Sequence, residues 1–280
     1  MAELHETTFQ FEGAEVAVQV GGCGLPLLMI HGSGPGASTL GNWRSVLGPL
    51  SDHFHVHAMD LIGFGRSDRK AEAPYFDFEL WQRQVTAMID RMPAGPIAII
   101  GHSISGALAL RQAAGNERVV GVLATGTMGL PFALNDGTVR TWTYPKDREA
   151  LVAAARTLIK NPDLIDEAYL RNREAVLRQP GYEEYFDEMF GGDKQSFIDA
   201  AVIPEQDLAR ILCPVSLIHG RDDEAFPPAP LSVRMAQHIP HADLYLLGNC
   251  SHSIAMEHPD KLIVTALSTF RQDARSGSPD

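Results

Sequence analysis

The chain has 280 residues, 45% hydrophobic and 21% charged, a composition typical of a globular protein with one large domain. Its 35 acidic and 23 basic residues give a formal net charge of −12, which argues against nucleic acid or an anionic membrane as a partner. No apolar run is long enough to span a bilayer, and residues 1–6 lack the basic and apolar character of a secretory signal. Three widely spaced cysteines, Cys23, Cys213 and Cys250, predict reduced thiols in a cytoplasmic protein.

Short β-rich runs alternate with helical segments through the first half of the chain. We predict strands at residues 7–11, 15–20, 27–30, 55–59, 97–100 and 119–124, and helices at 43–50, 78–92 and 106–114. Strand patterning returns at 215–218 and 244–247. The alternation predicts a mostly parallel eight-stranded sheet that is covered by helices on both faces, an α/β architecture.

This rhythm stops after Gly129. Residues 130–207 instead predict helices at 148–159, 165–177 and 197–201. Flexible linkers are missing on either side, so we interpret the segment as a helical lid inserted after the sixth strand, in preference to a separate small domain. The predicted organisation is a core formed by residues 1–129 and 208–272, a lid at 130–207 and a flexible tail at 273–280.

Residues 99–106, Ile-Ile-Gly-His-Ser-Ile-Ser-Gly, carry the strongest chemical signal. An apolar strand runs into a tight turn that presents Ser103, and a helix follows. Such a turn requires small residues two positions before and after the nucleophile, and Gly101 and Ser105 meet that requirement. The pattern is typical of the nucleophile turn of the α/β-hydrolase fold, although a match of this length also occurs by chance.

A serine nucleophile needs a base, and in this fold the acid and the histidine follow it in that order. Asp223 comes after the strand at 215–218, and His252 comes after the strand at 244–247. Asp222 competes for the role of the acid, but the spacing to the preceding glycine and the following proline favours Asp223. We therefore predict Ser103, Asp223 and His252 as a catalytic triad.

A glycine-rich loop at residues 31–36, His-Gly-Ser-Gly-Pro-Gly, follows the strand at 27–30. Glycines allow a backbone amide to turn toward a developing oxyanion, so we predict the amides of Ser33 and Ile104 as its donors. The sequence patterns of nucleotide-binding loops do not match. We expect no cofactor and no metal, because the triad needs neither.

Several segments resemble the meta-cleavage product hydrolases, which are α/β-hydrolases that split a carbon–carbon bond in 2-hydroxy-6-oxo-hexa-2,4-dienoates. The similarity lies in the loop 31–36 together with residues 42–44, in residues 60–68, and in the lid at 178–181 and 188–190. The resemblance implies that Asn42 lines the polar end of a pocket. It also implies a lid arginine on the substrate carboxylate, with Arg171 slightly preferred over Arg173. Relatives of this kind are often homodimers.

Three further residues are predicted to contact a small-molecule substrate: Gly32, His102 and Ser253. The family usually has asparagine at the position of His102 and tryptophan at that of Ser253. A carboxylesterase or lactonase that acts on a small apolar ester is therefore the alternative to a carbon–carbon hydrolase. A third reading is a non-catalytic member of the fold that binds a small molecule. A guanidinium inside the pocket favours the first reading, and a pocket without one favours the second.

Overall fold

The computed structural model describes residues 3–270, so the tail predicted at 273–280 lies outside the described residues. Its single sheet has the strand order β1-β2-β4-β3-β5-β6-β7-β8. The strands are β1 (His5–Phe11), β2 (Ala14–Gly21), β3 (Leu25–Ile30), β4 (Phe54–Met59), β5 (Ile97–His102), β6 (Val119–Thr125), β7 (Val215–Gly220) and β8 (Ala242–Leu247). β2 runs antiparallel to β1 and β4, and the other neighbours are parallel. The mostly parallel eight-stranded sheet is confirmed. Both ends of each predicted strand lie within two residues of the ends of the observed strand.

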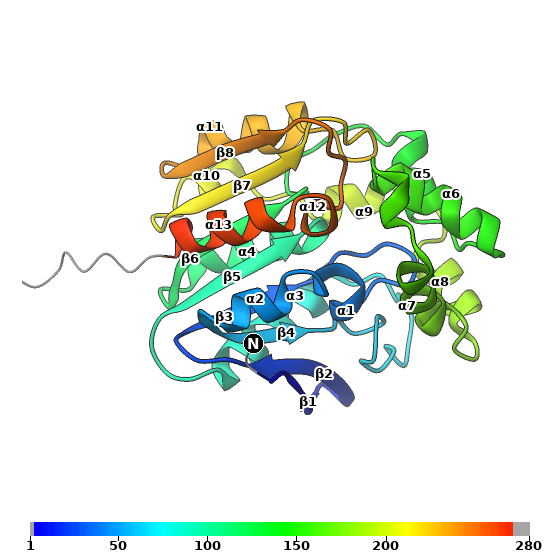
Figure 1. The fold of residues 1–280 in the computed structure, drawn as a ribbon, viewed down its shortest axis with the longest axis horizontal. Coiled ribbons are helices and arrows are strands. Elements are labelled where there is room, and N and C mark those ends of the chain that lie inside the picture. The colour runs from blue at the N-terminus through cyan, green and yellow to red at the C-terminus, as the bar shows by residue number, and fades with distance from the viewer. Residues whose placement is uncertain (1–2, 271–280) are drawn as a thin grey trace, which may run out of the picture.

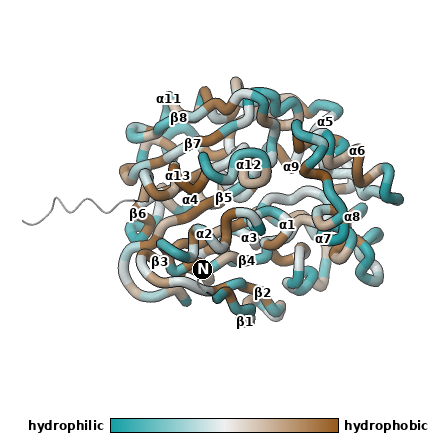
Figure 2. The backbone as a smooth tube through the Cα atoms, in the orientation of Figure 1, coloured by the Kyte–Doolittle hydropathy of each residue, from teal (hydrophilic) through white to brown (hydrophobic). Residues whose placement is uncertain are grey.

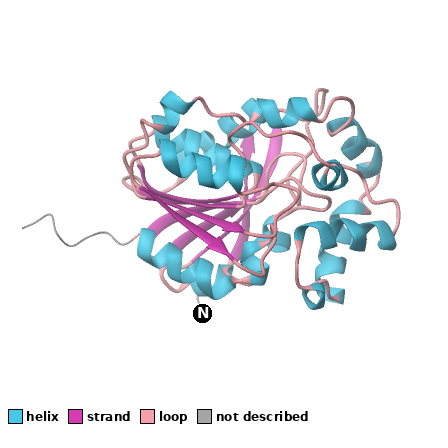
Figure 3. Cartoon of the chain, turned by 90° about the horizontal axis from the view of Figure 1, so that it is seen from above, coloured by secondary structure: helices cyan, strands magenta, loops and turns pink. Residues whose placement is uncertain are grey.

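Helices cover both faces of this sheet (Figures 1 and 3). One face packs on α1 (Thr39–Trp43), α2 (Leu47–Ser51), α12 (Ile254–Glu257) and α13 (Pro259–Thr269), and the other on α3 (Phe78–Arg91), α4 (Ile104–Gly115) and α11 (Arg234–His238). Successive residues of β3 alternate between the two apolar clusters, with Leu27 in one and Leu28 in the other. Both faces are thus buried, which explains why the central strands are unbroken apolar runs (Figure 2).

The prediction of one continuous helix at 43–50 is wrong, because the structure has two short helices, α1 and α2, in this region. Pro49 has no amide hydrogen, and its ring crowds the carbonyl four residues earlier, so a helix cannot run unbroken through it. Pro49 instead lies in the first turn of α2, where a missing donor costs nothing. The helices predicted at 78–92 and 106–114 are confirmed as α3 and α4, while α13, with Pro259 at its first position, was not predicted.

The chain between β6 and β7 is helical, as predicted. It contains α5 (Asp136–Thr141), α6 (Arg148–Leu158), the 3₁₀ turn Pro162–Leu164, α7 (Glu167–Leu177), α8 (Tyr182–Met189), α9 (Gln195–Ala200) and α10 (Glu205–Leu208). Figure 1 shows α5 to α8 beyond the carboxyl ends of the strands. None of the helices in residues 3–270 is long and apolar enough to cross a membrane.

His57 on β4 is a buried histidine without a hydrogen-bond partner at either ring nitrogen within residues 3–270. Its ring lies 4.4 Å from that of His55. Burial, and to a smaller extent His55, lower the pKa of His57 to about 4. The native state therefore favours the neutral ring.

We predict that this residue makes the protein less stable in mild acid. In the unfolded chain the histidine takes up a proton near pH 6.5, whereas in the native state it does so only near pH 4. Between these values the free energy of unfolding therefore decreases as the pH is lowered, by up to about 1.4 kcal/mol per pH unit. Urea unfolding at pH 7, 6 and 5 should show a shallower decline for His57→Leu than for the wild type. His241→Gln, at an exposed histidine, is the control. Equal declines in wild type and His57→Leu would contradict the assignment.

Candidate active site

Ser103 occupies a strained turn between β5 and α4, with φ 59° and ψ −125°. Positive φ is costly for a non-glycine residue and marks a conformation imposed by its surroundings. The turn packs so closely that a Cβ at position 101 would lie 2.3 Å from the Ser105 carbonyl oxygen, and one at position 106 would lie 2.1 Å from Thr127 Oγ1. Gly101 and Gly106 are therefore required for this geometry.

Ser105 stands where glycine is most common in such turns, and its side chain has a partner. The hydroxyl of Ser105 donates to the carbonyl oxygen of His31, and both residues are fully buried. This bond joins the nucleophile turn to the glycine-rich loop at 31–36. Serine at this position thus ties two loops together instead of only being small enough to fit.

His252 follows β8, and its Nδ1 lies 2.6 Å from Oδ2 of Asp223, the residue predicted as the acid. Both side chains are 3% exposed or less. The other oxygen of Asp223 accepts from the amide of Phe226 at 2.9 Å. Burial alone would raise the pKa of Asp223, but the charge and hydrogen bonds of His252 and His219 together hold it well below its usual range. Asp223 is therefore an ionised carboxylate that faces the imidazole.

Asp222, the competing acid, lies elsewhere. It is partly exposed, and its Oδ2 is 3.6 Å from Nζ of Lys160. The two neighbouring aspartates thus point in different directions, and it is Asp223 that contacts His252.

Ser103 and His252 line a common cavity of about 20 Å³. Its walls are formed by Gly32, Ser33, Gly34, Asn42, His102, Ser103, Thr141, Leu158, Arg173, His252 and Ser253. Every residue predicted for the site lines this cavity except Asp223, Ile104 and Arg171. No hydrogen bond joins the Ser103 hydroxyl to His252 in the described chain, and such contacts often tighten only around a substrate.

Of the two candidate arginines on α7, Arg173 lines the cavity and Arg171 does not. Arg173 is 6% exposed; it donates to the carbonyl of Pro35 at 2.9 Å, and its Nε has no partner among residues 3–270. Arg171 is exposed. The preference for Arg171 is thus corrected. Two residues on a helix are about 200° apart around its axis, so only one of this pair on α7 can face the cavity.

Of the two residues predicted as oxyanion donors, Ser33 lines the cavity together with Ser103, and Ile104 follows Ser103 in the chain. Ser33 is buried in the cavity wall, and its hydroxyl accepts from Trp142 Nε1 of the helical insertion at 3.1 Å. Ile104 is the first residue of α4, where an amide has no acceptor within the helix. Both positions are compatible with the predicted role.

His102 lines the cavity and has one unprotonated ring nitrogen. Its Nδ1 lies 3.0 Å from the carbonyl oxygen of Thr125, and a carbonyl only accepts, so Nδ1 carries the proton. Burial, followed by the nearby His252, lowers the pKa of His102 well below its usual value. The ring is therefore neutral, and Nε2, which has no partner within residues 3–270, is a hydrogen-bond acceptor.

The carboxyl end of α6 is bonded to the loop that carries His252, a connection that the sequence did not reveal. The carbonyl oxygen of Leu158 accepts from the amides of His252 and Ser253 at 3.0 and 2.9 Å. The Glu257 carboxylate accepts from the amides of residues 160, 161 and 251 at 2.7, 3.2 and 2.8 Å. Backbone contacts between distant segments leave no motif, and Glu257 by itself looks like an ordinary helix residue.

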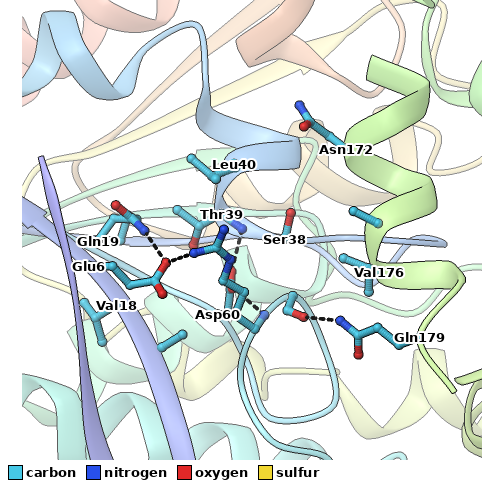
Figure 4. A pocket seen from close by; sticks show the side chains of 15 residues that line it. Glu6, Val18, Gln19, Ser38, Thr39, Leu40, Asp60, Asn172, Val176 and Gln179 are labelled. Carbon is cyan, nitrogen blue, oxygen red and sulfur yellow. Dashed lines mark hydrogen bonds and ion pairs between the residues drawn. The ribbon is translucent and has the colours of Figure 1, made fainter. Parts of the chain in front are cut away.

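A larger hollow of about 160 Å³ lies near the site and contains none of the predicted site residues (Figure 4). α1 and α7 contribute to both hollows. Thr39 and Asn172 line the larger one, while Asn42 and Arg173 line the cavity at Ser103. The larger volume therefore lacks Ser103 and His252, the predicted nucleophile and base, which line the smaller cavity.

Comparison with known proteins gives a consistent result. A model described as "Alpha/beta hydrolase family" matches residues 27–266. The 2-hydroxy-6-oxo-2,4-heptadienoate hydrolase of Pseudomonas putida strain F1 is 30% identical over 246 residues, covering 88% of each chain. The 2-hydroxymuconate semialdehyde hydrolase of Pseudomonas sp. strain CF600 is 30% identical over 238 residues, covering 85% of this chain and 83% of its own. A mutant of the meta-cleavage product hydrolase CumD from Pseudomonas fluorescens IP01 superposes with a TM-score of 0.88 at 28% identity, covering 94% of this chain and 97% of its own.

We predict that Glu257→Ala lowers the free energy of unfolding by about 1–3 kcal/mol, because three backbone amides lose their acceptor. Urea unfolding at pH 7 measures the change. Glu224→Ala, at an exposed acid near the same loops, is the control and should leave stability unchanged. Equal stability of the two variants would show that the contacts of Glu257 contribute nothing.

Proposed function

Because the chain belongs to the α/β-hydrolase family and is a hydrolase, we propose that Ser103, Asp223 and His252 are its catalytic triad. The observation that carries this proposal is the 2.6 Å contact between His252 Nδ1 and the buried Asp223, at a cavity shared with Ser103. His252 removes the proton of Ser103 or of a water molecule and later returns it to the leaving group. Asp223 holds the imidazole tautomer and stabilises its cation.

The proposed substrate is a 2-hydroxy-6-oxo-hexa-2,4-dienoate, and the reaction is hydrolysis of a carbon–carbon bond. The names of two relatives at 30% identity support this class. Arg173 supports it too, since a buried guanidinium with an unpartnered Nε at the cavity suits a carboxylate. Asn42, in the same wall, would bind the same end of the substrate.

In the proposed reaction the dienol is first protonated at carbon, which produces a ketone. Water or Ser103 then attacks the carbonyl carbon at the other end of the conjugated chain. The amides of Ser33 and Ile104 stabilise the tetrahedral oxyanion. The carbon–carbon bond breaks when the dienolate fragment leaves, with its charge delocalised onto oxygen, and this fragment takes up the proton held by His252. Attack by water releases the acid directly, whereas attack by Ser103 leaves an acyl ester that a water molecule then hydrolyses.

The alternative is hydrolysis of a small apolar ester or lactone. It is favoured by His102 and Ser253, which line the cavity where the resembling family usually has asparagine and tryptophan. This reaction needs only the triad and the oxyanion donors, so it leaves the burial of Arg173 unexplained. For that reason we rank it second.

We also propose that α5 to α9 act as a lid. A cavity of about 20 Å³ holds roughly one water molecule, which is far less than a dienoate requires. Thr141, at the end of α5, and Leu158, at the end of α6, close the cavity from the side of the insertion. Substrate entry therefore requires residues of these helices to move.

The reaction class can be tested by stopped-flow absorbance with a 2-hydroxy-6-oxo-hexa-2,4-dienoate beside p-nitrophenyl butyrate. We expect a kcat/KM for loss of the dienoate band well above that for the ester. Ser103→Ala, His252→Ala and Asp223→Asn should each lower turnover by about three orders of magnitude or more, with unchanged circular dichroism. Rapid ester cleavage with an intact dienoate band would instead establish the esterase.

Arg173→Gln should lower kcat/KM for the dienoate by about 10- to 100-fold, because a charged hydrogen bond to the substrate carboxylate is lost. The rate with p-nitrophenyl butyrate, which has no carboxylate, should change far less. Arg171→Gln, on the exposed side of α7, is the matched control. A similar loss with both substrates would mean that Arg173 acts only on the structure.

A further inference from the structure

A second buried histidine, His219, lies directly behind the acid of the proposed triad. It is the fifth residue of β7 (Val215–Gly220) and has no exposed surface. Its Nε2 lies 3.2 Å from Oδ2 of Asp223, the oxygen that also accepts from His252. The proposed reaction assigns it no part.

The neighbours of His219 define where its proton is. Nε2 lies 2.8 Å from the carbonyl oxygen of Phe226, and a carbonyl has no hydrogen to donate, so Nε2 carries a proton. That proton is directed at the Phe226 carbonyl and the Asp223 carboxylate together. The opposite nitrogen, Nδ1, is hydrogen-bonded to the hydroxyl of Ser232, which is also fully buried. Both ring nitrogens are therefore held, and the ring has one orientation.

Phe226 extends this contact to the base. Its amide donates to Oδ1 of Asp223, its carbonyl accepts from His219, and its ring stacks on His252 with centroids 4.4 Å apart and planes inclined by 26°. His219 thus contacts the acid directly and, through one residue, fixes the aromatic ring against which the base lies.

We propose that His219 is a positioning residue for the reaction, which holds Asp223 and Phe226 in place behind His252; this inference rests on the proposed triad. A buried carboxylate stays ionised only where N–H groups satisfy its oxygens. When His252 becomes a cation during turnover, the donor from His219 keeps Asp223 from taking the shared proton. Without that donor, Asp223 attracts the proton on His252 more strongly, so a reaction that needs the neutral ring should lose its rate at a higher pH.

The test is the rate at which a fluorophosphonate labels Ser103, measured from pH 5 to pH 9, because labelling needs the triad but no knowledge of the natural substrate. His219→Asn retains a polar atom toward Ser232 and loses the donor to Asp223, whereas the amide of His219→Gln reaches the position of Nε2. We expect about 10- to 100-fold slower labelling for His219→Asn, the change that corresponds to the loss of one hydrogen bond to a charged group. The fall of the labelling rate toward low pH, the acid limb of the profile, should begin at a higher pH than in the wild type. His219→Gln should restore part of the rate and part of the wild-type pH dependence.

His57→Leu is the control, since His57 is a buried histidine on β4 that takes no part in the triad contacts. Labelling of His219→Asn at the rate and pH dependence of His57→Leu would overturn the inference. Should His219→Asn fail to fold in thermal melts, Ser232→Ala takes its place. This variant removes the partner of His219 Nδ1 and should move the acid limb to higher pH as well. An acid limb at the wild-type position would equally overturn the inference.

Failure of the triad itself has a separate signature. Wild-type labelling that is absent, or that persists unchanged in His252→Ala, would remove the proposed triad and this inference with it. Slow labelling of His252→Ala beside normal labelling of His219→Asn would leave the triad standing and reject only the role of His219.

Discussion

An ionised carboxylate buried at the end of β7 is the constraint on which the rest of the site depends. Asp223 is 2% exposed, and a charge at that depth is tolerated only when donors surround it. The amide of Phe226 and the imidazoles of His219 and His252 supply them. Because Nδ1 of His252 is committed to Asp223, the nitrogen left for the cavity is Nε2. One buried charge therefore holds the turn after β7, the tautomer of His252 and the ring nitrogen that His252 leaves free.

The sheet and the three residues proposed for the triad could be predicted because their signals are local. A strand buried on both faces is an apolar run, and Ser103, Asp223 and His252 each follow such a run in a turn of characteristic residues. The arginine could not be chosen in the same way. Arg171 and Arg173 have the same chemistry, and the choice depends on the rotation of α7 about its axis, which a spacing of two residues does not define.

Other features escaped prediction because they join segments that are distant in sequence. The acceptor of the His252 amide is a backbone carbonyl at Leu158, and a carbonyl has no identity in a sequence. In the sequence His219 is an ordinary residue of a strand, because its contacts with Asp223 and Phe226 form only when the turn after β7 folds back. By contrast, two departures from the common pattern are accommodated by neighbours: Ser105 bonds to His31, and His102 bonds to Thr125. A residue that departs from the common pattern of this turn is thus compatible with its geometry when a nearby carbonyl accepts a hydrogen bond from its side chain.

The bonds between the end of α6 and the His252 loop join one wall of the cavity to the segment that carries His252. A motion that lifted the end of α6 would break the two bonds from Leu158 and loosen the backbone at His252, while Asp223 and Phe226 would still contact its ring. Because Leu158 also closes the cavity, the residue that must move for substrate entry is the same residue that anchors the backbone at His252.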